Sequence, residues 1–186
     1  MLNCLTKHYA DLWSEVWSED FCNQTWSIND NRLHSFSVLQ RNWSWETPLR
    51  NYFERRQALV EIDVVAAMAL GLSLQDLEII YNIQFPVLQQ NENDTWYDSK
   101  GNIVFTCSKG LTGVGMDRQS WKANRGEKVG ENIYSGTEQP VSYIIDPAKS
   151  ELYGGQTVTY YPPYNRQNRI EDYRRAWEHF EKVFKD

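Results

Sequence analysis

Hydrophobic residues recur at helical spacing in several parts of the chain. The first such stretch is residues 5–18, where an amphipathic helix is predicted by the apolar stripe Leu5, Tyr9, Leu12, Val16 and Trp17. Thr47 followed by Pro48 is typical of an N-cap and a first helical position, so a long helix is expected to begin there and to end at Gly71. Every residue from 64 to 70 is apolar, which predicts that this half of the helix is buried on several sides.

Two further helices are predicted from their capping residues. Ser73, with Asp76 three residues later, predicts a helix whose inner face is Leu74, Leu77, Ile80 and Tyr81. Pro86 is expected to stop or kink that helix. Asn168 and Glu171 form a plausible capping pair for a last helix with the stripe Ile170, Tyr173, Trp177, Phe180 and Phe184.

The middle of the chain carries strand signals instead. Residues 95–97 and 103–105 are rich in strand-forming types and flank a tight turn with Gly101 where a positive φ is needed, which predicts a β-hairpin. The sequences VSYII and QTVTYY, at residues 141–145 and 156–161, indicate short strands. Residues 108–140 are rich in Gly, Lys and Asn and predict a long loop.

These elements predict an α+β fold. We expect a buried central helix and a helical cluster, together with a β-hairpin and short antiparallel strands. The 186 residues, 41% of them hydrophobic, suffice for one domain with a core. Residues 1–47 are interpreted as an N-terminal helical arm, and residues 48–186 as a single α+β domain.

Charge and composition exclude several classes of protein. A formal net charge of -6 argues against a protein that coats nucleic acid with its whole surface, although a local basic patch remains open. The three cysteines have no C-x-x-C spacing and favour a reducing cytoplasm. The longest apolar run, VVAAMALGL, is too short for a bilayer. The histidines show no metal-ligand spacing, so neither a metal nor a cofactor is predicted.

One segment reverses the overall charge. Residues 100–128 hold six basic and two acidic side chains, and a tryptophan lies among them. In proteins that bind nucleic acid, basic side chains contact the phosphate backbone and aromatic rings stack on the bases. A segment that combines both is therefore a candidate for such contacts. The alternative is a loop kept soluble by its charges. The candidate nucleic-acid-binding residues are Lys109, Arg118, Trp121, Lys122, Arg125 and Lys128.

Enzyme motifs are present only in part, and no catalytic residue is nominated. The stretch YPPY, residues 161–164, resembles the base-gripping motif of amino-methyltransferases, but Tyr161 stands where Asn, Asp or Ser would accept hydrogen bonds from the amine. A strand ended by two prolines before a helix is the preferred interpretation. Asp98 and Lys100 match the acid-x-Lys spacing of nucleases, yet they fall in the hairpin turn.

Residues 55–115, from RRQALVEIDVV to SKGLTGVG, resemble the C-terminal segment of large restriction-modification DNA methylases, of the adenine type, from bacterial phage-defence loci that include the DISARM-like group. The sequence TYYPPYNRQNRIEDYRRAWEHF is similar to the end of that segment. The resemblance covers about residues 50–184. It implies an accessory part, because the methyl-transfer motifs of those proteins lie upstream of the matching region.

These observations predict a non-catalytic accessory module of a restriction-modification or phage-defence system that holds duplex DNA without sequence preference. The alternative is a domain that docks onto a methylase or another defence protein through aromatic side chains such as Trp43 and Trp45. A nuclease that uses Asp94, Asp98 and Lys100 is the third hypothesis.

Overall fold

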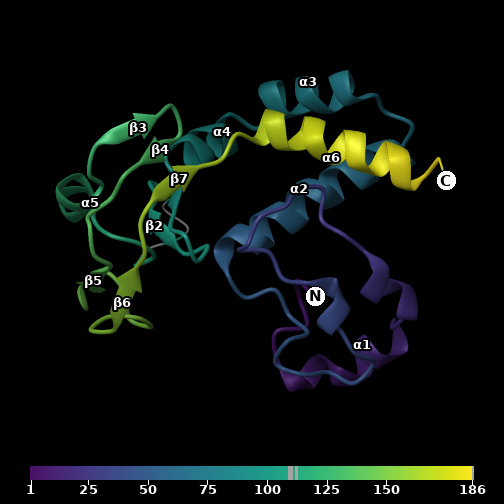
Figure 1. Ribbon diagram of the computed structural model, residues 1–186, viewed down its shortest axis with the longest axis horizontal. Helices are drawn as coiled ribbons and strands as arrows, with labels where there is room; N and C mark the ends of the chain where they lie inside the picture. Colours follow the sequence, from purple (N-terminus) through teal and green to yellow (C-terminus); the bar gives the residue numbers. More distant parts are fainter. Residues whose placement is uncertain (109–110, 112, 186) are drawn as a thin grey trace.

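The computed structural model describes residues 1–108, 111 and 113–185. It confirms the α+β fold, with α2, α3 and α6 packed together at one end and the sheets with α5 at the other (Figure 1). The helices are α1 (Ala10–Glu15), α2 (Tyr52–Ala69), α3 (Leu74–Gln84), α4 (Pro86–Asn93), α5 (Arg118–Asn124) and α6 (Arg169–Val183). The strands are β1 (Trp96–Tyr97), β2 (Ile103–Phe105), β3 (Lys128–Gly130), β4 (Ile133–Tyr134), β5 (Val141–Ile144), β6 (Thr157–Tyr160) and β7 (Tyr164–Arg166).

The long helix α2 begins later than the sequence predicts. Its N-cap is Asn51, whose side chain accepts a hydrogen bond from the backbone N–H of Glu54, while the Glu54 carboxylate accepts from that of Asn51. This reciprocal capping box satisfies two amide groups at the helix start. Thr47 is not the cap, because its hydroxyl accepts from the backbone N–H of Ser44 at 2.9 Å.

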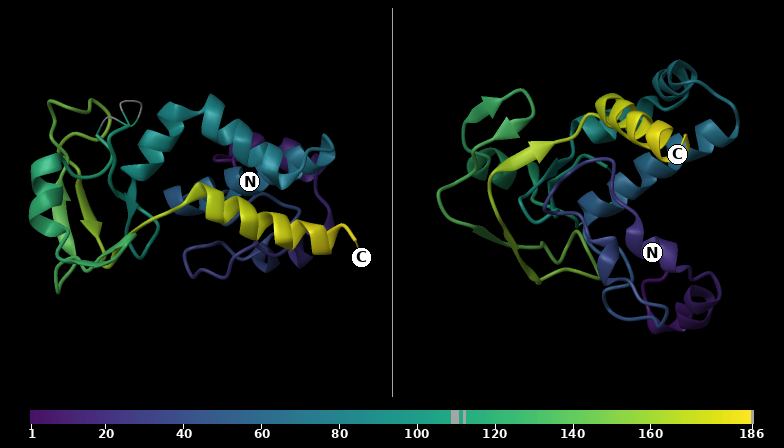
Figure 2. Two further views of the ribbon diagram at one scale, coloured as in Figure 1. Left: turned by 90° about the horizontal axis from the view of Figure 1, so that it is seen from above. Right: turned by 45° about the vertical axis from the view of Figure 1, so that its right-hand side comes forward.

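Helices α2, α3 and α6 enclose the helical core. Val60, Val64, Leu77, Tyr81 and Tyr173 lie at its centre, and α6 packs along both other helices (Figure 2). The caps of α3 and α6 are the predicted residues Ser73 and Asn168. As expected, α3 ends before Pro86, which begins α4.

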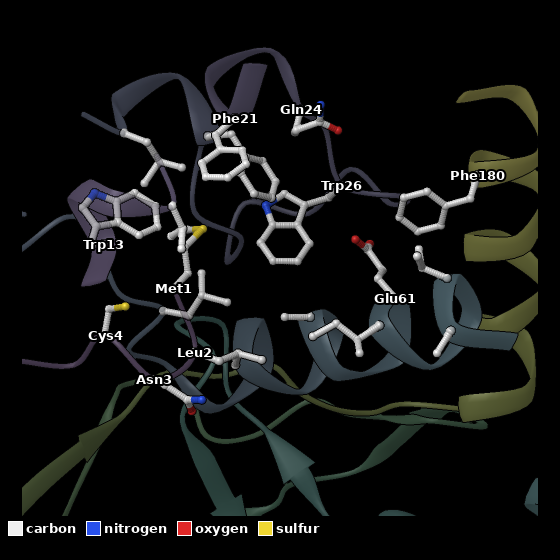
Figure 3. Close-up of a pocket in the computed structure, with 18 of the residues that line it drawn as sticks. Met1, Leu2, Asn3, Cys4, Trp13, Phe21, Gln24, Trp26, Glu61 and Phe180 are labelled. Atoms are coloured by element: carbon white, nitrogen blue, oxygen red, sulfur yellow. The ribbon is translucent and has the colours of Figure 1, made fainter. Parts of the chain in front are cut away.

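The prediction that residues 64–70 are entirely buried is wrong. Val64 and Ala67 face the helical core, but Ala66 and Ala69 are exposed and Leu70 is 77% exposed. The exposed side of α2 is the floor of an apolar groove whose opposite wall comes from the first 40 residues of the chain (Figure 3).

The first 40 residues are less helical than predicted. Only a 3-10 turn (Lys7–Tyr9) and the short helix α1 form within residues 5–18, followed by 3-10 turns at Glu19–Asn23 and Phe36–Val38. Of the predicted stripe, Leu5, Tyr9, Leu12 and Val16 are exposed and Trp17 is half-buried, whereas Trp13, which was not part of the stripe, is buried in a local cluster. The division of the chain at residue 47 stays a prediction.

The strands form two small antiparallel sheets. The larger has the order β2-β1-β7-β4-β3, and β5 pairs with β6 in the other. The predicted hairpin is β1 and β2, with Gly101 at φ +85°. The expected loop at residues 108–140 is wrong in part, because α5, β3 and β4 form within it.

A network of ion pairs links the helices to one another. The Arg56 guanidinium on α2 lies 2.8 Å from the Asp172 carboxylate on α6 and 3.0 Å from Glu92 on α4. Arg169, at the start of α6, lies 2.8 Å from Glu92 and 2.9 Å from Asp63. Arg56, Arg169 and Asp172 are buried, so each charge depends on its partners for solvation. No described helix is long and apolar enough to cross a membrane.

A matched pair of leucines tests the correction to α2. Leu77 is 8% exposed, and Leu77→Ala is expected to lower the free energy of unfolding by about 2 to 5 kcal/mol because it leaves a cavity. Leu70→Ala is expected to change it by less than about 0.5 kcal/mol. Urea unfolding measures both values, and a Leu70→Ala loss as large as that of Leu77→Ala would show that the end of α2 is buried.

The ion-pair network predicts a dependence of stability on pH. Burial alone would raise the pKa of Glu92, but attraction to Arg56 and hydrogen bonds from Arg169 outweigh burial and hold it below the ordinary value of 4.5. A carboxyl whose pKa is lowered by folding stabilises the protein above its unfolded pKa, and this stabilisation is lost as pH falls. The free energy of unfolding is therefore expected to decrease below pH 4.5.

Glu92→Gln removes this titration. The variant is expected to be less stable than the parent at neutral pH and to lose less stability between about pH 6 and about pH 3. Glu178→Gln, at an exposed position on α6, is the matched control and should keep the parent profile. Equal acid sensitivity of Glu92→Gln and the parent would contradict the assignment.

Candidate functional site: a basic pocket beside the larger sheet

Helix α5 brings three of the predicted residues to the surface of the larger sheet. Its N-cap Asp117 accepts hydrogen bonds from the backbone N–H groups of Gln119 and Ser120 at 2.8 and 2.9 Å. The inward side chain is Trp121, whose ring stacks on Phe105 of β2 with centroids 5.6 Å apart. Because Trp121 anchors the helix, Arg118 and Lys122 are left exposed to solvent.

The next two basic residues follow directly in the chain. Arg125 is the C-cap of α5, and Lys128 begins β3, where it pairs with Tyr134 of β4. Strand β4 in turn pairs with β7, which carries Arg166. Helix α5 and the paired strands β3, β4 and β7 therefore bring basic side chains from distant parts of the sequence to one place.

We call the resulting site the basic pocket. It has a volume of about 240 Å³ and is lined by five cationic side chains, Arg118, Lys122, Arg125, Lys128 and Arg166. Two carboxylates, Asp94 and Glu131, also line it. Cationic groups thus outnumber acidic groups in a protein whose overall charge is negative.

Aromatic rings orient the arginines without neutralising them. The guanidinium of Arg118 lies 5.4 Å from the ring centroid of Phe105, and that of Arg125 lies 4.8 Å from that of Tyr134. Cation–π contacts of this kind restrict a side chain while its N–H donors remain available to a ligand. Among the described residues, none of the five cations forms an ion pair.

Among the described residues, Arg166 is the one cation of the pocket whose side chain donates hydrogen bonds to other residues. Its Nε and Nη2 donate to the side-chain oxygen of Asn132 at 3.0 and 2.7 Å, and its Nη1 donates to the Asn93 carbonyl at 3.0 Å. Arg166 lies outside residues 100–128, so it is not among the candidates that the sequence predicts. The structure places it on β7, and only the order of the strands reveals its position.

One of the candidate residues differs from the prediction. Trp121 is 4% exposed and surrounded by Phe105, Trp96, Tyr134 and Tyr164, so its ring cannot stack on a base. Its role is to hold α5 in place. Lys109 lies outside the described residues. Lys100, which contributed to the charge of the basic window, lies in the hairpin turn and does not line the pocket.

One of the two carboxylates of the nuclease hypothesis, Asp98, has a structural role. Asp98 is 0% exposed, and its oxygens accept from the backbone N–H groups of Lys100, Asn102 and Tyr161. The side chain therefore closes the hairpin and ties it to the end of β6. Within the described part of the chain, no group of three or more His, Cys, Asp or Glu side chains could hold a metal ion.

The Pro-Pro-Tyr stretch is also part of the scaffold. Tyr164, which follows the two prolines, is fully buried against Trp121 and begins β7. A ring in that position cannot stack on an extruded base as the aromatic residue of an amino-methyltransferase does. The prolines therefore join two strands, β6 and β7, where the sequence indicated a strand followed directly by a helix.

Comparisons with protein-family models, with curated proteins and with solved structures found no match to this chain. The chemistry of the site must therefore be inferred from its own side chains. Exposed guanidinium and ammonium groups that converge on a shallow pocket are suited to bind an anion with several oxygens, such as a phosphate.

The role of Asp98 can be tested by mutation. Asp98→Ala is expected to lower the free energy of unfolding by about 3 kcal/mol or more, because several buried N–H donors lose their acceptor. Lys100→Ala, at an exposed position of the same turn, should change it by less than about 0.5 kcal/mol. Thermal or urea unfolding measures both, and a near-neutral Asp98→Ala would reopen the possibility of a functional carboxylate.

Proposed function

We propose that this protein is a non-catalytic module that holds duplex DNA by its phosphate backbone, as an accessory part of a restriction-modification or phage-defence system. The single observation that carries the proposal is the basic pocket, where five cations converge without an ion pair among the described residues. The resemblance to the accessory segment of phage-defence methylases supports the same proposal. In such a system a methylase or another defence protein would supply the chemistry.

The dimensions and polarity of the pocket favour a backbone contact. Its volume of about 240 Å³ is smaller than the clefts that enclose drug-sized ligands. Lys122, Arg118 and Lys128 extend from the surface, so they can reach phosphates without inserting into a groove. Contacts of this type position DNA but read no sequence.

The protein-docking alternative receives less support from its nominated residues. Trp45 is 68% exposed, but Trp43 is half-buried and donates a hydrogen bond from Nε1 to the Cys4 carbonyl at 2.8 Å. The Arg50 guanidinium covers the Trp45 ring at 4.5 Å from its centroid. The two indoles therefore do not form the broad apolar patch that is typical of a protein interface.

Salt dependence provides the first test. Each neutralised phosphate releases counterions, so contacts from Arg118, Lys122, Arg125 and Lys128 predict a slope of roughly -3 to -4 for log affinity against log salt concentration. The dissociation constant is expected to be on the order of 10⁻⁴ to 10⁻⁶ M at physiological salt and similar for duplexes of different sequence. Fluorescence anisotropy of labelled duplexes measures both quantities.

A charge-matched pair of variants provides the control. Replacing these four residues by glutamate should abolish binding at low salt. The same replacement of Lys7, Lys149, Lys182 and Lys185, which do not line the pocket, changes the net charge equally and should reduce affinity only modestly. Circular dichroism checks that both variants are folded. Equal weakening by the two variants, or no binding by the parent at low salt, would show that the pocket does not hold DNA.

A further inference from the structure

The apolar groove beside α2 is a second concave surface, distinct from the basic pocket. Its floor is the exposed side of α2, including Val65, Ala66 and Ala69, and its opposite wall includes Trp13, Phe21 and Trp26 (Figure 3). The volume is about 820 Å³, within the range of sites that enclose small organic molecules. Apolar side chains dominate the lining, so water in the groove is readily displaced by an apolar ligand.

One charged side chain points into this apolar surface. Glu61 of α2 is 7% exposed, and its carboxylate lies between Trp26 and Phe180 (Figure 3). Its Oε1 accepts three hydrogen bonds, from the backbone N–H and the hydroxyl of Ser27 at 2.9 and 2.6 Å and from the Gln57 amide at 3.0 Å. These contacts fix the orientation of the carboxylate.

The other oxygen of Glu61 has no such contacts. Oε2 accepts no hydrogen bond from a described residue, and within the described chain Glu61 forms no ion pair. Oε2 is not among the fully buried atoms, so it faces the groove, and a cation there would form a charge-assisted contact in surroundings that water solvates poorly. The neighbouring Trp26 ring adds an electron-rich face, which also favours a cation.

We propose that the groove binds a small amphiphilic molecule that has an apolar chain and a single cationic head group, of the chemical class of an alkylamine. The chain lies along α2 against the aromatic wall, and the ammonium group contacts Oε2 of Glu61. The volume and apolar lining of the groove suit the chain, and the fixed carboxylate, which has no ion-pair partner among the described residues, suits the cationic head group. The proposal does not depend on the DNA-holding function.

The test uses three probes with the same chain length, decylammonium, decanol and decanoate, below their micelle concentrations. Isothermal titration calorimetry is expected to show saturable binding of decylammonium, at least about tenfold tighter than that of decanoate. Glu61→Gln should weaken decylammonium binding by about tenfold or more while changing decanol binding by less than about twofold, because only the charged hydrogen bond is lost.

Two matched controls separate the groove from general effects of charge and of the helix. Glu15→Gln removes a carboxylate from α1 that does not line the groove, and it should leave decylammonium binding unchanged. Ala66→Trp fills the groove and should abolish binding of decylammonium and decanol, whereas Leu59→Trp, exposed on α2 outside the groove, should not. Circular dichroism confirms folding of each variant.

Several outcomes would overturn the proposal. Equal decylammonium affinity in Glu61→Gln and the parent would show that the carboxylate does not bind the head group. Absence of saturable decylammonium binding to the parent would show that the groove does not bind this class of ligand. Sedimentation equilibrium is expected to show a monomer, and a dimer that Ala66→Trp dissociates would identify a second copy of the chain as the occupant.

Discussion

Two buried arginines determine how the helices of this protein fit together. Arg56 and Arg169 lie in the interior, where a guanidinium without partners would cost several kcal/mol. Their carboxylate partners come from α2, α4 and α6, and Glu92 serves both arginines at once. Helices α2 and α6 give each arginine one carboxylate, Asp172 for Arg56 and Asp63 for Arg169. Glu92 of α4 adds a second carboxylate to both arginines, so the network joins all three helices.

The same network positions the larger sheet. Helix α4 runs directly into β1, and β7 runs directly into α6. Because β1 and β7 are neighbours in the sheet, fixing α4 and α6 brings the two strands to the same place. The position of Arg166 beside Lys122 and Lys128 in the basic pocket is a consequence of this arrangement, since β7 lies between β1 and β4.

Short-range signals in the sequence were sufficient for several elements. Ser73 with Asp76 predicts the start of α3, and Gly101 predicts the hairpin turn, because both depend on contacts within four residues. The sequence prediction starts α2 too early, because Thr47 and Pro48 resemble an N-cap and a first helical position. The sequence signal of the true start is the capping box formed by Asn51 and Glu54.

Features that depend on distant contacts could not be predicted in this way. Helix α5 has seven residues and buries a single large side chain, Trp121, so it leaves no periodic pattern. The excess of basic residues at positions 100–128 indicates a basic site in this region. Arg166 lies outside that segment and reaches the pocket only because β7 pairs with its neighbouring strands. The apolar run in α2 predicts that other elements pack against the helix. It does not predict that one side of the helix stays unpacked and lines the groove.

The basic pocket and the apolar groove belong to different ends of the molecule (Figures 1 and 2). The charged side chains differ in sign, since cations predominate in the pocket while Glu61 is the charged side chain among the described residues that line the groove. Under the two proposals, the basic pocket attracts a polyanion such as DNA, while the carboxylate of Glu61 repels it from the groove. A cationic amphiphile is guided in the opposite sense. The two surfaces can thus select different ligands without competition, although a rigid network of helices connects them.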